Sequence, residues 1–192
     1  STGSYSSGDL WISGTVSSKF RFLSYGISSG LYYSRLSQSE SLVLVNTVAG
    51  MFHIKNLDMK VAYILKNSGL VLKKYSKKNV SEDIATSQIL ALSKKLAYLP
   101  LELNLDIEFM NNTSTPSLYL SGLFSFSSSI FLRCSLSSDK FDQAIERGIT
   151  KDLITGTGLG LGFKTKNYSF EIGGYFFNPG NLILGVSMGK YR

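Results

Sequence analysis

The sequence contains one cysteine, Cys134, and one histidine, His53. A single cysteine excludes an internal disulfide. Zinc sites need several Cys, His or acidic ligands, and His53 has neither a second histidine nor a cysteine cluster to join. We therefore interpret His53 as a surface or interface residue and Cys134 as a small apolar side chain on a strand.

Long apolar runs are also missing. The longest largely apolar stretch, Leu42–Phe52, is far shorter than the roughly 20 residues of a membrane-spanning helix. This excludes a helical membrane protein but not a membrane β-barrel, whose strands need only about 9 to 11 alternating residues. Charged residues make up 17%, below the roughly 25% usual for soluble domains.

The charge that is present is mostly basic, with a formal net charge of +7. Such a balance can indicate nucleic-acid binding, but the chain has no nucleic-acid-binding motif. Many lysines instead fall at the ends of alternating segments, where basic side chains usually face head groups or solvent. We expect no nucleic-acid partner.

Alternation of apolar with small or polar residues dominates the sequence, most clearly in Gly156–Arg192. There Gly156, Gly158, Gly160 and Gly162 fall on one face of a predicted strand, opposite leucine and phenylalanine. The period of two continues through position 163, so this is no phosphate-binding turn between a strand and a helix. A face with so few side chains would leave voids in a packed core and favours a wide lumen.

The same period predicts an all-β chain of about 11 antiparallel strands in a single domain spanning 1–192. The strands are expected near 10–16, 21–35, 40–52, 59–65, 86–95, 101–109, 118–126, 130–136, 156–163, 168–176 and 182–189. The first reversal is expected at Ser18–Phe20. Short connections alternate with mostly longer ones, as in an outer-membrane barrel.

The long connections leave local alternatives open. The stretch Asn67–Ala85 breaks the alternation and is predicted to be the first of them. A helix capped by Ser81, with Ile84, Gln88 and Leu92 on one stripe, is the alternative to a strand from Thr86. The second long connection, 138–155, contains KFDQAIER, which could form a short helix.

Two polar groups are candidate sites. Glu102, Asn104, Asp106 and Glu108 form one face of a strand, and we interpret them as a solvated, lumen-facing row rather than a catalytic carboxylate set. Lys73, Lys74, Lys77 and Lys78 lie in the basic stretch after the fourth strand; we interpret them as a solvated loop, with docking of a partner or of lipopolysaccharide as the alternative. No nucleophile, base and orienting residue can be placed together, so we expect neither an enzyme nor a metal or cofactor site.

Four segments, in order along the chain, carry a resemblance to a known family. They are Ser6–Leu10, Val71–Tyr75, Leu92–Leu101 and Gly156–Lys164. With these segments the chain resembles the PorV/PorQ family of outer-membrane proteins, within the FadL-like barrels, and is most similar to the PorQ branch. Barrels of that type have 14 strands, so the resemblance implies that this chain is the C-terminal part of a transmembrane barrel and that about three strands precede it.

By this resemblance the protein is expected in the bacterial outer membrane, in contact with its lipid. It would anchor proteins, or hand them on, at the cell surface for the type IX secretion system, with secretion-system or surface-attachment proteins as partners. Two other functions remain open: a FadL-like channel for small hydrophobic compounds, and a soluble secreted β-sandwich that binds protein or glycan.

Overall fold

The computed structural model describes residues 7–37, 39–74, 84–138, 155–178 and 181–190. These residues form strands and one short 3-10 helix, η1 (Lys55–Leu57). The strands are β1 (Ser7–Phe20), β2 (Leu23–Leu36), β3 (Ser39–Ile54), β4 (Met59–Lys73), β5 (Ser87–Lys95), β6 (Leu101–Met110), β7 (Ser117–Ser125), β8 (Ile130–Ser137), β9 (Thr157–Lys164), β10 (Tyr168–Asn178) and β11 (Asn181–Lys190). In the described part of the chain, no helix has the length and apolar character needed to cross a membrane.

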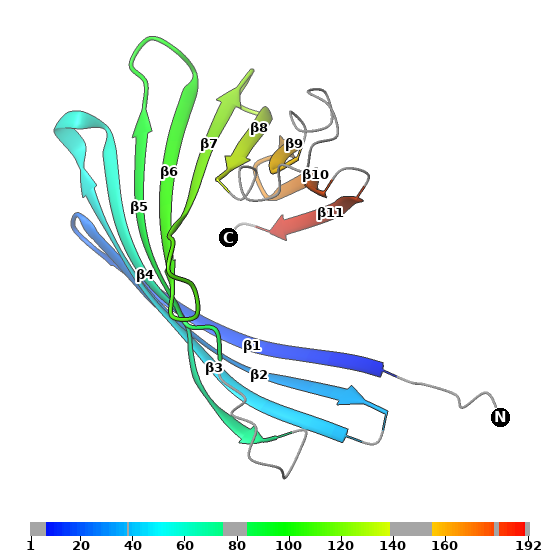
Figure 1. Cartoon of the computed structure of the whole chain (residues 1–192). Helices are drawn as coiled ribbons and strands as arrows, with labels where there is room; N and C mark the ends of the chain where they lie inside the picture. Colours follow the sequence, from blue (N-terminus) through cyan, green and yellow to red (C-terminus); the bar gives the residue numbers. More distant parts are fainter. Residues whose placement is uncertain (1–6, 38, 75–83, 139–154, 179–180, 191–192) are drawn as a thin grey trace. The chain divides into compact units, whose positions relative to one another are not determined.

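The described strands form one 11-stranded sheet in sequence order, with β1 and β11 at the two ends of that order (Figure 1). Neighbouring strands are antiparallel, as the pairings of β1 with β2 and of β10 with β11 show. The predictions of an all-β chain and of about 11 antiparallel strands are therefore confirmed.

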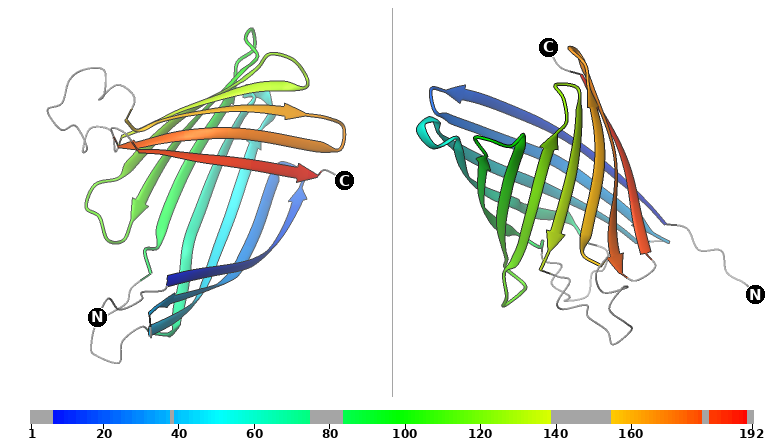
Figure 2. Two further views of the ribbon diagram at one scale, coloured as in Figure 1. Left: turned by 90° about the vertical axis from the view of Figure 1, so that its right-hand side faces the viewer. Right: turned by 90° about the horizontal axis from the view of Figure 1, so that it is seen from above.

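The chain divides into two compact units. Unit 1 comprises Ser1–His53, Ala62–Leu90 and Glu108–Pro116, and unit 2 comprises Ile54–Val61, Ala91–Ile107 and Ser117–Arg192. In unit 1, β1 and β2 pair along their whole length, and β2 pairs equally fully with β3. In unit 2, β9, β10 and β11 lie side by side, in yellow-orange to red in Figure 2.

The first reversal lies later than the sequence predicted. The turn is at Arg21 and Phe22 rather than at Ser18–Phe20, because β1 and β2 stay paired up to Phe20 and Leu23. Arg21 adopts a left-handed backbone conformation with φ 52°, which lets two residues reverse the chain.

Strand β4 is much longer than predicted. We expected a connection from Asn67, but the strand runs on to Lys73. Asn67 has φ 58°, a left-handed conformation that asparagine tolerates better than most residues. Its backbone carbonyl accepts a hydrogen bond from Thr86 Oγ1 at 3.1 Å, so the irregularity is held in place without ending the strand.

The strand predicted from Thr86 is confirmed as β5. The alternative helix is wrong, because Gln88 and Leu92 both lie within this strand and not on a helical stripe. The KFDQAIER segment, which could form a short helix, falls outside the described residues.

The predicted alternation of connection lengths holds only in the middle of the chain. The connections 74–86, 111–116 and 138–156 are longer than 55–58, 96–100, 126–129 and 165–167. The set predicted to be mostly longer also includes the connections at 37–38 and 179–180, which are as short as the turn at 21–22.

The described residues contain almost no apolar core. Phe131, 5% exposed, is the one large apolar side chain that is buried, and the most deeply buried side chain is that of Ser87. In β2, β6 and β9, exposed apolar residues alternate with less exposed residues that are mostly small or polar. Within this part of the chain, all the strands belong to one sheet.

Candidate functional site

The predicted polar row on β6 lies opposite that strand's exposed leucines. Glu102, Asn104, Asp106 and Glu108 are partly buried, whereas Leu103 and Leu105 are exposed. This alternation follows from the period of two along a strand.

Glu102 is neutralised by its neighbours. Its Oε1 accepts hydrogen bonds from Lys60 Nζ at 2.7 Å and from Ser93 Oγ at 2.6 Å. Asn104 Nδ2 donates to Ser121 Oγ at 3.4 Å. The row is thus linked to side chains on β4, β5 and β7. The sequence placed the carboxylates on one face but gave no sign of these partners.

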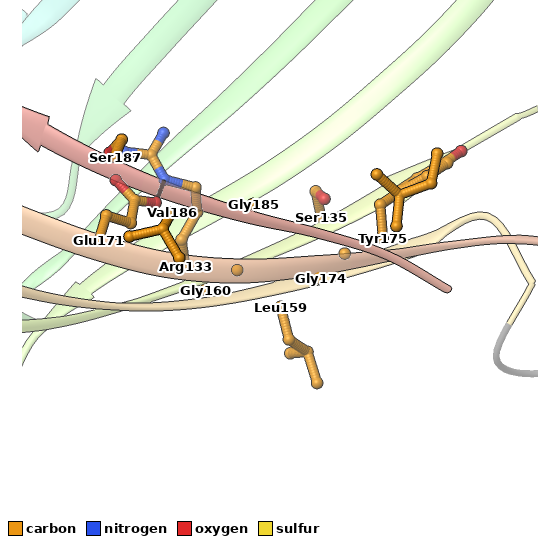
Figure 3. Close-up of a pocket in the computed structure, with 13 residues that line it drawn as sticks. Arg133, Ser135, Leu159, Gly160, Glu171, Gly174, Tyr175, Gly185, Val186 and Ser187 are labelled. Atoms are coloured by element: carbon orange, nitrogen blue, oxygen red, sulfur yellow. Dashed lines mark hydrogen bonds and ion pairs between the residues drawn. The ribbon is translucent and has the colours of Figure 1, made fainter. Parts of the chain in front are cut away.

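A groove with a volume of about 570 Å³ lies in unit 2 (Figure 3). It is formed by β8, β9, β10 and β11. Its charged and hydroxyl-bearing lining residues are Arg133, Ser135, Glu171, Tyr175 and Ser187, and glycines form much of the rest. None of the described lining residues is a histidine or a cysteine, so the groove has neither an imidazole to activate a serine nor a thiol nucleophile.

An ion pair crosses this groove over a glycine. Arg133 on β8 pairs in register with Gly160 on β9, and Glu171 lies on β10. Arg133 Nε donates to Glu171 Oε1 at 3.0 Å, and Figure 3 shows the two side chains directed toward each other. A Cβ at Gly160 would lie 3.2 Å from the same oxygen. The missing side chain therefore leaves room for the pair.

The other glycines of β9 are also covered by side chains of neighbouring strands. The Phe131 ring lies over Gly162, and Ser135 and Tyr175 lie beside Gly158. Lys164 Nζ lies 4.9 Å from the centre of the Phe131 ring. The expectation of an empty glycine face is wrong for this region, because larger residues from β8 and β10 fill the space.

The predicted lysine cluster is only partly described. Lys73 Nζ is 2.5 Å from Glu40 Oε2, and Lys74 is exposed. Hydrogen bonds from Lys73 and Tyr33 lower the pKa of Glu40, and Glu40 raises the pKa of Lys73. Lys77 and Lys78 lie outside the described residues, so the cluster remains a prediction.

The two singled-out residues lie in ordinary strand positions. His53 lies near the end of β3, and its backbone N–H donates a hydrogen bond to the Phe22 carbonyl at 2.8 Å. Cys134 is exposed on the face of β8 that also carries Ile130 and Leu136. Among the described residues, no group of three or more His, Cys, Asp or Glu side chains is placed to hold a metal ion.

Sequence reasoning missed Phe131, Arg133 and Glu171. Each of the three lies next to a glycine of a neighbouring strand. The pairing of a large residue with a glycine was the one feature that could have identified them. That signal requires the register between strands, which alternation alone does not supply. No protein-family model and no curated protein matches this chain.

Proposed function

We propose that this chain is part of an outer-membrane β-barrel whose apolar face contacts lipid. The observation that carries the proposal is an antiparallel sheet whose large apolar side chains are exposed on strand after strand, without a buried core in the described residues. Val186 and Leu184 on β11, 79% and 70% exposed, are extreme examples. Monomeric soluble proteins rarely expose contiguous apolar surface of this extent.

A soluble β-sandwich is a weaker explanation of the same pattern. A sandwich buries the apolar faces of two sheets against each other. The described strands follow one another in sequence order in a single sheet and do not divide into two separate sheets. A lipid environment would cover the apolar face without further protein.

The function that follows is non-enzymatic. The resemblance to the PorV/PorQ family supports a role as scaffold or anchor for protein secretion and surface attachment by the type IX system. In that role the connections between strands bind the partner proteins, and the strands hold these connections in place.

A FadL-like channel for small hydrophobic compounds is the second candidate. Its supporting observation is a groove of about 630 Å³ in unit 1, lined largely by small and apolar residues such as Gly26, Ala49 and Ile64. Against it, the glycines of β9 are covered by side chains, and an ion pair crosses that part of the sheet. Uptake of a hydrophobic fluorophore into protein-containing liposomes would favour the channel.

The membrane proposal is tested by a matched pair of substitutions on β6. Leu105 lies on the exposed apolar face and its neighbour Asn104 on the opposite, polar face. The full-length protein is refolded into lipid vesicles, and folding is measured by heat-modifiable migration on a gel. We expect Leu105→Lys to reduce the free energy of unfolding by about 2–4 kcal/mol and Asn104→Lys to change it little.

Detergent-independent folding in water, with both variants folding equally well, would overturn the membrane proposal. If the membrane proposal holds, two further measurements distinguish the scaffold from the channel. A scaffold retains partner proteins after extraction in mild detergent, whereas a channel transports its solute in liposomes that contain no other protein.

A further inference from the structure

Lysines gather at one end of the strands of unit 2. Strand β5 ends at Lys94 and Lys95, β9 ends at Lys164, and β11 ends at Lys190. Because neighbouring strands are antiparallel, these strand ends share an edge with η1 and with the β9–β10 turn. We name this set the basic edge; its exposed members are Lys55, Lys94, Lys95, Lys164, Lys166 and Lys190.

Acidic residues do not balance this edge. The described acids there are Asp58 in the β3–β4 connection and Glu102, and Glu102 is already paired with Lys60. At the opposite ends of β7–β11, the described residues 117–118, 136–138, 155–158 and 181–183 include no charged side chain. Apart from Asp106, Arg133 and Glu171 within the strands, the described charges of unit 2 therefore lie at this one end, and most of them are positive.

Exposed aromatic and apolar residues occupy the turns of the same edge. Tyr98 in the β5–β6 turn is 99% exposed, and Leu99 beside it and Phe126 in the β7–β8 turn are also exposed. A tyrosine at the end of a strand is typical of the membrane–water interface, where its ring meets the acyl chains and its hydroxyl meets water. Lysines near that level extend their ammonium groups toward phosphates.

We propose that the basic edge binds the head groups of anionic phospholipids in the leaflet that it meets. The inference rests on the proposed function, because insertion of the apolar face brings the strand ends to head-group level. The supporting observations are the exposure of all six lysines, the scarcity of acids beside them and the aromatic residues in the intervening turns. Each basic residue near such a surface strengthens attraction to anionic lipid by about fivefold.

The test compares two vesicle compositions, phosphatidylcholine alone and phosphatidylcholine mixed with phosphatidylglycerol. The full-length protein is diluted from urea into each, and the rate of appearance of the heat-modifiable form is measured. We expect insertion to be on the order of tenfold faster with phosphatidylglycerol, and the gain to disappear in high salt. The triple variant Lys55→Gln, Lys94→Gln and Lys166→Gln is expected to lose most of the gain.

A control variant removes positive charge elsewhere. Arg35→Gln and Lys66→Gln change exposed residues of β2 and β4 in unit 1, outside the basic edge, and are expected to keep the full gain. Equal insertion into both vesicles, or equal loss in the basic-edge variant and this control, would overturn the inference and leave the barrel proposal intact. Such a result would favour an acidic protein as the partner of this edge. Failure to form a heat-modifiable species in any vesicle would overturn the barrel proposal itself.

Discussion

The ring of Phe131 on β8 lies directly over Gly162 on β9, its partner in the strand register. A Cβ atom at position 162 would fall inside van der Waals contact with three atoms of the ring. Phe131 is also the one large apolar residue classed as buried in the described part of the chain. The absence of a side chain at Gly162 therefore makes room for the aromatic ring. The two residues pack against each other on the face that carries polar and small residues.

Replacement of Gly162 by alanine is expected to destabilise the sheet. The added methyl group meets Phe131, and relief requires the ring or the β8–β9 pairing to move. Such overpacking costs about 1–3 kcal/mol. Equilibrium unfolding of the vesicle-inserted protein in urea measures the change in the free energy of unfolding.

Gly185→Ala on β11 is the matched control, because no atom lies within 4 Å of a Cβ built there. We expect a change within about 0.5 kcal/mol for this variant. Combining Phe131→Ala with Gly162→Ala should remove the steric part of the cost. Equal effects of the two single glycine substitutions would contradict the role assigned to Phe131.

Gly69 on β4 is expected to be still less tolerant of alanine. A Cβ at this position would collide with the backbone carbonyl of Leu44 on the same unit. A backbone atom cannot rotate away as a side chain does, so the β3–β4 pairing itself must shift. We expect Gly69→Ala to cost at least the upper end of the roughly 1–3 kcal/mol range for overpacking.

The comparison for this variant is Gly50→Ala on β3, which has open space around its Cβ position. Unfolding midpoints of both variants are measured under the same conditions. A Gly69→Ala protein as stable as Gly50→Ala would show that β3 and β4 are not this close at Leu44.

The bounds of some strands could be predicted from the sequence, and the bounds of others could not. The alternation in 101–109 and 156–163 placed β6 and β9 correctly, because a period of two is a property of one strand. The break in the alternation after Asn67 misled the prediction for β4, since a basic, serine-bearing stretch without alternation is typical of a connection. The hydrogen bond that the Asn67 carbonyl accepts comes from Thr86, just before β5, so the information that keeps β4 going is not local.

The same limit applies to the candidate sites. The sequence grouped Glu102 with Asp106 by spacing alone, but Lys60 reaches Glu102 from 42 positions away. Arg133 and Glu171 are separated by 38 positions, and nothing in either segment predicts that they meet over Gly160. Pairing partners follow from register, which tertiary packing decides.

The Glu40–Lys73 ion pair is expected to contribute to the stability of the fold only within a defined pH range. The pKa of Glu40 is lowered from its ordinary 4.5, so its contribution to stability is present above that value and is lost as the pH falls through the lower folded-state pKa. The pKa of Lys73 is raised from 10.5, so its contribution is present below 10.5 and is lost as the pH rises through the higher folded-state pKa. The pair is solvent-exposed, so its effect should be small and sensitive to salt.

The measurement is the difference in unfolding midpoint between the unmodified protein and Lys73→Gln as a function of pH. We expect a constant difference between pH 4.5 and 10.5 that vanishes at both extremes. Lys74→Gln, one position along, should show no such window. A difference that does not change with pH would mean that Lys73 acts through packing and not through its charge.

Cys134 provides a built-in probe of which face of β8 meets lipid. It is the chain's single cysteine and lies on the exposed apolar face, while Ser135 faces the glycine-rich groove. In the vesicle-inserted protein, we expect a charged methanethiosulfonate reagent to modify Cys134 at least tenfold more slowly than in the urea-unfolded chain, because a thiolate and a charged reagent are both excluded from hydrocarbon.

The comparison protein carries Cys134→Ser and Ser135→Cys, which moves the thiol by one residue to the other face of β8. Its thiol should react with the charged reagent faster than Cys134 does, and a fluorophore on Cys134 should be quenched by brominated lipid more strongly than one at position 135. Quenching that is equal at the two positions would place both faces of β8 in the same environment, which a strand with one lipid-facing side does not allow.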